Sequence, residues 1–440
     1  MTGPVDDVHQ HLQFPLIQAL LQRRSRRFAA GAELPVGPLA YRSVLPPQPL
    51  TLDEEAAMAF AACGVTGYAL AELPYGQGVE PESAGGHIMT HFIGRTVASG
   101  DAMHDCTVFV INDQGTWLLK RPQDYPKDQI PSLIEAARRQ DLRSLYDRAR
   151  VQIADHRIDI PRQVPFVAPF NKWVANVQGT TYLLPVAELS SLYINVLLSM
   201  FDDDFRYFVL DDHQGYRPAG LERFARSAGG TLYDDFGAGR TTTLSLLDTW
   251  ICEFVSIEQG AILQNLGLMA AALQLGGFPH FAAHPFIWPV CLGFRTEPVS
   301  LGRILGLPAG AGPELGVPTP VGLEVQGQTL LRSFCPPYYA NMEQAVHAFL
   351  EEKYADGRGT FRDGGAATGW KDPVTIQKQI PRYSNQAIDA TIACSQYIYD
   401  TYGRFPASTG PFRTVLAYQA HHLDDAFYTK FYKDTCSQHG

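Results

Sequence analysis

The stretch IEQGAILQNLGLMAAALQLGG, residues 257–277, ends the longest helical pattern of the sequence, which spans residues 244–275. Its second half is apolar nearly all round, and a helix of that kind is buried at the centre of a fold. The two glycines that follow, Gly276 and Gly277, are expected to cap it. Gly260 precedes small and apolar residues, a pattern that suits a backbone amide facing a ligand and also an ordinary packed helix.

Strand patterns precede this helix along the chain. CTVFVI, residues 106–111, is followed by the turn 112–115 and by TWLLKR, which predicts a hairpin. Residues 180–186 and 206–211 read as strands around a helix at 187–201. The chain therefore combines strands and helices.

A dense basic run, RRSRR at residues 23–27, follows a short helix pattern at 12–22. Guanidinium groups are planar donor forks suited to phosphate, and the serine adds a hydroxyl donor. By itself the run is equally a solvated charge cluster. The interpretation as a ligand site depends on the other motifs of the sequence.

A small-residue segment, GRTVASGDA at 94–102, lies in the glycine-rich region 65–105, which we expect to consist of loops. Small residues let backbone approach a flat ligand closely, and Ser99 can donate a hydrogen bond to one. Just before this region, Thr51 and Glu54 form a capping-box pattern for a helix that ends at Gly64.

Taken in order, these motifs resemble the nitroreductase superfamily of FMN-dependent enzymes, over residues 12–325 with gaps. The pattern is most similar to the branch of azoline dehydrogenases of peptide natural-product pathways. The resemblance implies an α+β fold, with a central mixed β-sheet flanked by helices. It places an FMN-binding domain at residues 1–325, with an insertion around 120–245. Residues 326–440 would then form a helical extension, with helices at 341–354, 384–402 and 413–433.

The resemblance also implies a phosphate grip. Arg23, Ser25 and Arg27 match the residues that hold the FMN phosphate, ribityl chain and pyrimidine edge. Arg24 belongs to the same cluster, although it can point elsewhere, as can Arg26. A second basic residue usually completes the grip, and here the candidates are Arg295, Arg303 and Arg332.

Two further segments match flavin contacts of the superfamily. Ala98, Ser99 and Gly100 match a segment that reaches the flavin bound mainly to the other subunit, although Ala98 stands where proline is usual. Gln259 and Gly260 match the segment whose backbone amides face the flavin N5 and O4 edge. The resemblance thus implies a homodimer with flavin at the subunit interface.

The implied activity is two-electron redox chemistry on a small organic molecule or a peptide, with NADH or NADPH as a possible electron donor. An azoline-type oxidation of a heterocycle and a flavin-free scaffold or binding subunit are the alternatives. No acid–base constellation stands out, and the candidates for catalysis are Ser99, His104, His421 and Tyr428.

Histidine pairs are a weaker signal. His87 and His91, and likewise His280 and His284, are four residues apart, a spacing that binds metal on a helix. A histidine that faces a substrate is favoured over a metal ligand at these positions, and a structural histidine is favoured over both. A metal-dependent hydrolase built on the two pairs is a further alternative, and no metal is expected. On a C-terminal helix one face would be shared by His421, Asp424 or Asp425, Tyr428 and Tyr432, and this face could line a pocket, close over the flavin or pack on the core.

Composition excludes several classes of protein. The 440 residues carry a formal charge of -10 and are 45% hydrophobic, which argues for a globular chain and against a nucleic-acid surface. Seven scattered cysteines without a C-x-x-C pair suggest reduced thiols in a cytoplasmic protein. Neither a signal-peptide core nor a long apolar run is present, so no membrane span is expected.

Overall fold

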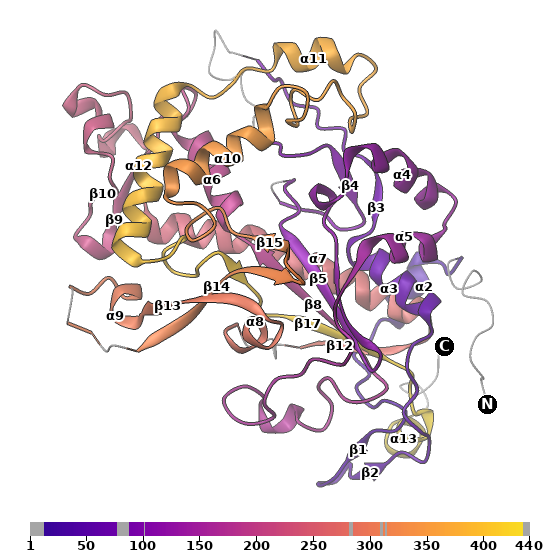
Figure 1. Cartoon of the computed structure of the whole chain (residues 1–440). Coiled ribbons are helices and arrows are strands. Elements are labelled where there is room, and N and C mark those ends of the chain that lie inside the picture. The colour runs from indigo at the N-terminus through magenta and orange to yellow at the C-terminus, as the bar shows by residue number, and fades with distance from the viewer. Residues whose placement is uncertain are drawn as a thin grey trace.

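A seven-stranded sheet forms the centre of the computed structural model, which describes residues 13–76, 88–100, 102–280, 285–308, 311–312 and 315–433. Its strand order is β12-β17-β8-β5-β6-β7, and β16 pairs with β8 beside this path (Figure 1). The strands are β5 (Cys106–Asn112), β6 (Gly115–Leu119), β7 (Arg150–Ala154), β8 (Thr181–Glu188), β12 (Gly276–His280), β16 (Phe412–Arg413) and β17 (Ala417–His421). Every neighbouring pair is antiparallel, so the chain is α+β as expected, but the prediction of a mixed central sheet was wrong.

Helices cover one face of this sheet. The helices α3 (Leu52–Cys63) and α7 (Leu244–Ala272) pack on β5, and α2 (Leu16–Gln22) packs on α7. The predicted capping box is present, since Thr51 and Glu54 bond each other's backbone N–H groups and the helix ends before Gly64. Further helices complete this side and one end of the molecule, namely α4 (Ile130–Arg138), α5 (Leu142–Ala149), α6 (Ser190–Phe201), α10 (Met342–Tyr354), α11 (Pro373–Gln379) and α12 (Asn385–Tyr402).

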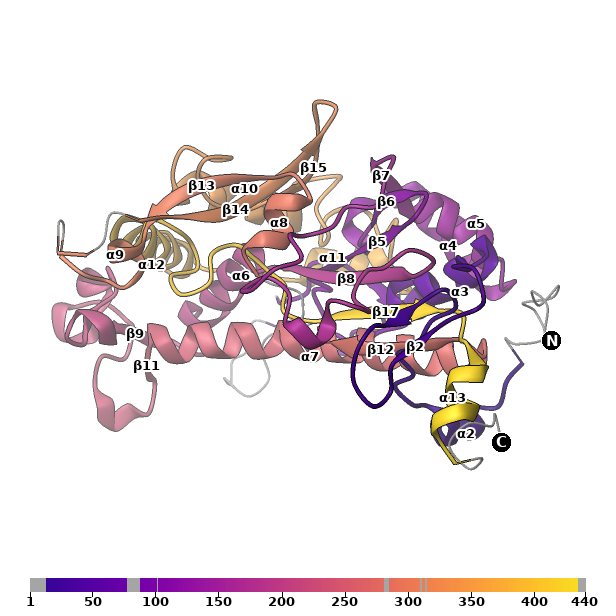
Figure 2. The ribbon, with the colours of Figure 1, turned by 90° about the horizontal axis from the view of Figure 1, so that it is seen from below.

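A second, three-stranded sheet covers the other face, as Figure 2 shows. It contains β13 (Phe294–Ser300), β14 (Gly316–Val325) and β15 (Gln328–Arg332), with α8 (Ile287–Cys291) beside it. Consequently β5 is buried on both sides: Val108 and Val110 pack towards the helices, whereas Phe109 and Ile111 pack towards α8 and β13. The remaining elements are short, namely β1 (Glu33–Leu34), β2 (Tyr41–Arg42), β3 (Val65–Tyr68), β4 (Ile93–Arg95), β9 (Phe208–Asp211), β10 (Arg217–Pro218), β11 (Thr241–Thr243), α9 (Leu301–Ile304) and α13 (Asp425–Phe431).

The C-terminal segment differs most from its prediction. The helices expected at 341–354 and 384–402 are present as α10 and α12, but residues 413–433 contain the strand β17 and the short helix α13. Because β17 lies between β12 and β8, the chain after residue 325 supplies part of the central sheet. A purely helical extension was therefore wrong.

Three local predictions also need correction. Gly276 and Gly277 begin β12 and do not cap α7, where Gln274 instead takes the left-handed backbone conformation, with φ of 57°. The amphipathic, highly charged pattern of residues 131–150 predicts a single helix, but Gln140, which also has φ of 57°, divides it into α4 and α5. The region 65–105, expected to be loops, contains β3 and β4.

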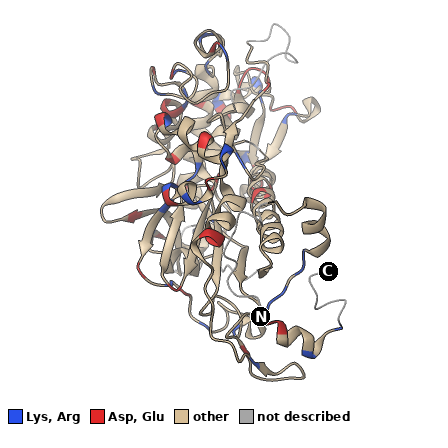
Figure 3. Ribbon diagram, turned by 90° about the vertical axis from the view of Figure 1, so that its right-hand side faces the viewer, with Lys and Arg blue, Asp and Glu red and all other residues tan. Residues whose placement is uncertain are grey.

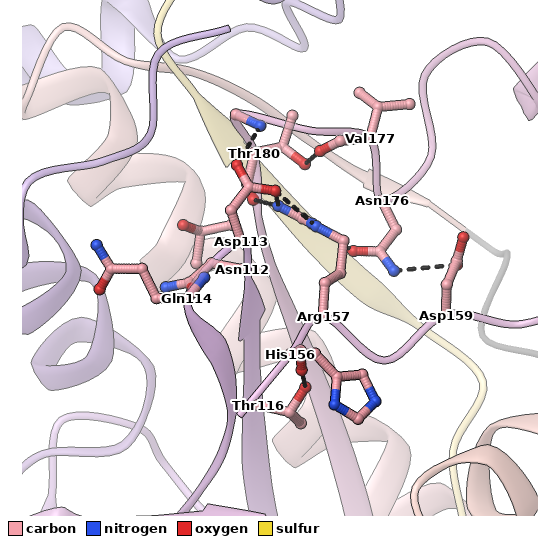
Figure 4. Close-up of polar contacts among 12 residues, drawn as sticks. Asn112, Asp113, Gln114, Thr116, His156, Arg157, Asp159, Asn176, Val177 and Thr180 are labelled. Carbon is pink, nitrogen blue, oxygen red and sulfur yellow. Dashed lines mark hydrogen bonds and ion pairs between the residues drawn. The ribbon is translucent and has the colours of Figure 1, made fainter. Parts of the chain in front are cut away.

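A polar cluster fixes the loop between β7 and β8 to the central hairpin (Figure 4). The guanidinium of Arg157 donates to Asp113 Oδ1 at 2.8 Å, to Asn176 Oδ1 at 2.7 Å and to the Thr180 carbonyl at 2.7 Å. The Asn176 amide in turn donates to Asp159 at 3.0 Å. These contacts hold residues 157–180 close to the end of β5.

Charged residues are dispersed over the fold. In the view of Figure 3, segments with Lys and Arg and segments with Asp and Glu are both scattered along the ribbon. No helix within the described part of the chain is long and apolar enough to cross a membrane.

Candidate functional site

One cavity brings the basic run and α7 together. It has a volume of about 300 Å³. The N-terminal run lines it through Arg23, Arg24 and Ser25. The other walls come from α7, β12 and β17, through Gly260, Leu263, Gln264, Gly267, Gly277, Pro279, Leu416 and Tyr418. We call this space the arginine cavity.

Backbone pairing holds the basic run at this position. The helix α2 ends at Gln22, and the chain continues in an extended conformation. The Arg26 N–H donates to the Gly277 carbonyl at 3.1 Å, and the Gly277 N–H donates back at 3.0 Å. The methylenes of Arg23 lie along α7, since a Cβ at Gly267 would be 3.5 Å from Arg23 Cδ. The exposed residues of the run, Arg23 to Ser25, thereby face the cavity.

The last two arginines of the run point elsewhere. Arg26 is buried, and this burial lowers the pKa of its guanidinium. Arg27 donates to the Asn171 side chain and lies over the Phe278 ring, 4.7 Å from its centroid. Among the described residues that line the cavity, Arg24 is present and Arg27 is not. The structure thus favours Arg24 over Arg27 as a cavity contact.

The predicted amides of Gln259 and Gly260 do not face the cavity. Both residues lie inside α7, where each backbone N–H bonds a carbonyl of the preceding turn. The Gln259 side chain is buried and donates to the Arg413 carbonyl at 3.4 Å. Gly260 contributes space instead, because no atom lies within 4 Å of the position of a Cβ there.

The Ser99 segment lies beside α7 but is not among the residues lining the arginine cavity. Ala98 and Gly100 are exposed, and a Cβ at Gly100 would be 3.4 Å from Phe254 of α7. The Ser99 hydroxyl accepts a hydrogen bond from the His104 N–H at 3.3 Å. The His104 ring stacks on His91, and burial lowers the pKa of His104 to about 2, so this imidazole is neutral.

A buried ion pair, which the sequence motifs did not reveal, connects this segment to α7. Arg95 and Glu258 are joined at 3.4 Å, with side chains 0% and 1% exposed. Glu258 also accepts hydrogen bonds from the N–H groups of Asp105 and Cys106, at 3.2 and 3.1 Å. Asn265 donates to the Thr96 carbonyl at 2.9 Å. Arg95 belongs to the segment 94–102 and Glu258 to the stretch 257–277, which are two of the motifs quoted from the sequence. The presence of both motifs in one chain was therefore the only sequence signal for this ion pair.

The C-terminal candidates, His421 and Tyr428, are not among the residues that line the arginine cavity. His421 is buried in β17, and burial lowers its pKa to about 3. Tyr428 belongs to α13, and its hydroxyl accepts from the Phe28 N–H at 3.0 Å. The two side chains come from different elements, so the predicted shared helix face was wrong.

The structure describes only one histidine of each predicted pair, so neither pair can be assessed as a metal site. His87 and His284 lie outside the described residues, whereas His91 bonds the Met103 carbonyl and His280 contacts the Tyr182 ring. No group of three or more His, Cys, Asp or Glu residues in the described ranges is arranged to hold a metal ion.

A larger cavity, of about 780 Å³, lies between β4, α10 and β15. Its charged lining is largely internally paired: Arg332 contacts Glu352 at 3.0 Å, and Lys127 contacts Asp363 at 2.6 Å. Lys353 forms part of the wall and donates to Asn195 at 2.8 Å, and burial lowers the pKa of its amine well below the ordinary value. Sequence patterns gave no indication of this cavity.

Comparison with known proteins yields little. No protein-family model matches the chain, and no curated protein is significantly similar to it. Among solved structures, it is similar to a protein from Ralstonia eutropha JMP134 that is assigned as a nitroreductase. The two chains are 14% identical, with a TM-score of 0.29, and the alignment covers 63% of this chain and 75% of that one. At this distance the likeness says nothing of activity, and function must be argued from the site.

Proposed function

We propose that the protein is an FMN-dependent oxidoreductase that binds the flavin at the arginine cavity. The observation that carries the proposal is the convergence of Arg23, Arg24 and Ser25 with the small-residue face of α7 on one cavity. Two guanidinium groups and a hydroxyl form a donor set suited to a phosphate monoester. Gly260 leaves room for a flat group against the helix, because no atom lies within 4 Å of the position of a Cβ there.

The size of the cavity and the exposed apolar residues beside it also support a dimer, in which a second copy of the chain completes the site. A volume of about 300 Å³ is at the lower limit for pockets that hold small ligands. The cavity lies at one end of an exposed stripe of α7 that includes Trp250, Ile257 and Gln264. Next to α7, α2 exposes apolar side chains, namely Leu16, Ile17, Leu20 and Leu21. A second copy packed on this surface would enlarge and close the site, in keeping with the homodimer that the sequence resemblance implies.

FMN, when bound, supplies the two-electron transfer itself. The residues of this chain would bind its phosphate, orient it against α7 and limit access of water. The substrate that we propose is a small organic molecule or a peptide. NADH or NADPH would supply electrons in a reductive reaction.

Flavin retention tests the proposal. The purified protein should be yellow and release FMN on denaturation. Replacement of both Arg23 and Ser25 by alanine removes two phosphate donors, each worth about 1.5–3 kcal/mol towards a charged group, and should abolish retention at micromolar protein. Bound FMN can be measured from absorbance after gel filtration.

Arg358→Ala is the matched control, because Arg358 is exposed and distant in sequence, and it should retain full flavin. Arg27→Lys should also retain flavin, because Arg27 faces Asn171. A colourless wild-type protein that takes up no added FMN would exclude the proposal and favour the flavin-free scaffold. Equal flavin content in wild type and the double variant would show that the basic run is a solvated surface.

A further inference from the structure

Tyr418 stands out among the residues that line the arginine cavity. It belongs to β17 and is only 3% exposed. Within the described chain its hydroxyl makes no hydrogen bond, although the residue lines a polar cavity. The ring is buried, but the hydroxyl oxygen is not sealed in the interior, so it can donate a hydrogen bond to a ligand in the cavity.

The sheet fixes the direction of this side chain. Tyr418 pairs with Pro279 of β12 on one side and with Leu183 of β8 on the other. Its neighbour Gln419 points the opposite way and donates to the Val174 carbonyl at 2.9 Å. Alternation along the strand therefore directs Tyr418 towards α7, where its ring lies 3.9 Å from the position of a Cβ at Gly267.

Gly277 makes the space for the hydroxyl. A Cβ at Gly277 would lie 2.5 Å from Tyr418 Oη and 2.8 Å from the Gln419 carbonyl. Only glycine at position 277 therefore leaves space for the Tyr418 side chain at the inner wall of the cavity. This steric requirement explains Gly277 better than the helix cap predicted from the sequence.

We infer that the Tyr418 hydroxyl is the second half of the phosphate grip, donating a hydrogen bond to the phosphate monoester that Arg23 and Ser25 hold from the other side. This inference rests on the proposed FMN site. The arginines expected in that role are engaged elsewhere: Arg295 with Glu297, Arg303 with backbone carbonyls of 399–401, and Arg332 with Glu352. Burial raises the pKa of Tyr418, which keeps the phenol protonated and able to donate.

Tyr418→Phe tests this role with two ligands that differ only in the phosphate. Binding of FMN and of riboflavin to apoprotein is followed by quenching of flavin fluorescence. A donor to a charged phosphate is worth about 1.5–3 kcal/mol, so Tyr418→Phe should weaken FMN binding about tenfold to hundredfold and leave riboflavin binding unchanged. Without ligand, the variant should melt at the wild-type temperature or higher, since no hydrogen bond of the protein is lost.

Tyr182→Phe is the control, because Tyr182 is a buried tyrosine of the adjacent strand that stacks on Trp288 at 5.2 Å on the other face of the sheet. It should change neither affinity. Unchanged FMN affinity in Tyr418→Phe, or an equal loss for FMN and riboflavin, would overturn the inference while leaving the flavin site itself in place. Failure of the wild-type protein to bind FMN would instead overturn the proposed function, and this inference with it.

Discussion

Gly260 occupies an interior position of α7, where alanine would give a more stable helix by about 1 kcal/mol. The same residue lines the arginine cavity, and its missing Cβ leaves open space there. Gly260→Ala should therefore raise the free energy of unfolding by about 1 kcal/mol and lower FMN occupancy. Denaturant unfolding and bound-flavin absorbance measure the two effects.

Gly67→Ala is the control, because Gly67 is also at an open position but lies on β3, and it should leave flavin occupancy unchanged. A Gly260→Ala variant that is more stable and keeps full flavin would show that the cavity face of α7 is not in contact with the flavin ring.

Which side chains of the basic run face the cavity could not be read from the sequence. The run was predictable as a group, because four guanidinium groups in five residues form a strong anion site. Its extended backbone is fixed by a bridge between Arg26 and Gly277, a contact between residues far apart in the chain. That bridge decides that Arg24 faces the cavity and that Arg27 faces Phe278.

At the scale of elements, α7 is joined to the segment before β5 by a buried ion pair. Removal of one partner of such a pair leaves a buried charge and is destabilising by about 3–5 kcal/mol. We expect that loss in Arg95→Ala, measured by denaturant unfolding. The double variant Arg95→Met/Glu258→Gln should recover part of it, because no unpaired charge stays buried and the amide oxygen can replace one of the two carboxylate oxygens that accept from Asp105 and Cys106. A double variant less stable than Arg95→Ala would show that the pair contributes net stabilisation.

The sequence predicted those elements whose patterns lie within a few neighbouring residues. It did not predict a strand whose position depends on pairing with distant parts of the chain. The hairpin of β5 and β6, the capped α3 and the long α7 each depend on neighbouring residues, and each is present. In contrast, Ala417–His421 is buried on every side between two other strands, so it lacks the alternation that marks a half-buried strand. The aromatic spacing that follows it suggested a helix that exists only as α13.

The same distinction holds for the whole molecule. The glycine- and proline-rich region 301–324 precedes the domain boundary predicted at residue 325, yet the chain after it returns to the central sheet and supplies Tyr418 to the candidate site. Sequence order alone could not place β17 beside β12, because that pairing joins strands about 140 residues apart, and pairing over long separations leaves no local pattern. The candidate site therefore combines a motif near the N-terminus, which was predicted, with a strand near the C-terminus, which was not.

Buried neutral histidines should make the stability of the whole molecule depend on pH. Burial lowers the pKa of His280 to about 4, against about 6.5 when unfolded. Below pH 6.5 the unfolded chain therefore binds a proton that the folded chain does not, and stability falls as pH falls from about 6.5 to about 4. His280→Leu removes this titration and should reduce the slope of unfolding free energy against pH by about 1.4 kcal/mol per pH unit in that window.

Urea unfolding at a series of pH values measures this slope. At pH 8, where His280 is neutral in both states, the slopes of the wild type and the variant should agree. An unchanged slope between pH 4 and 6.5 would mean that His280 is protonated in the folded protein.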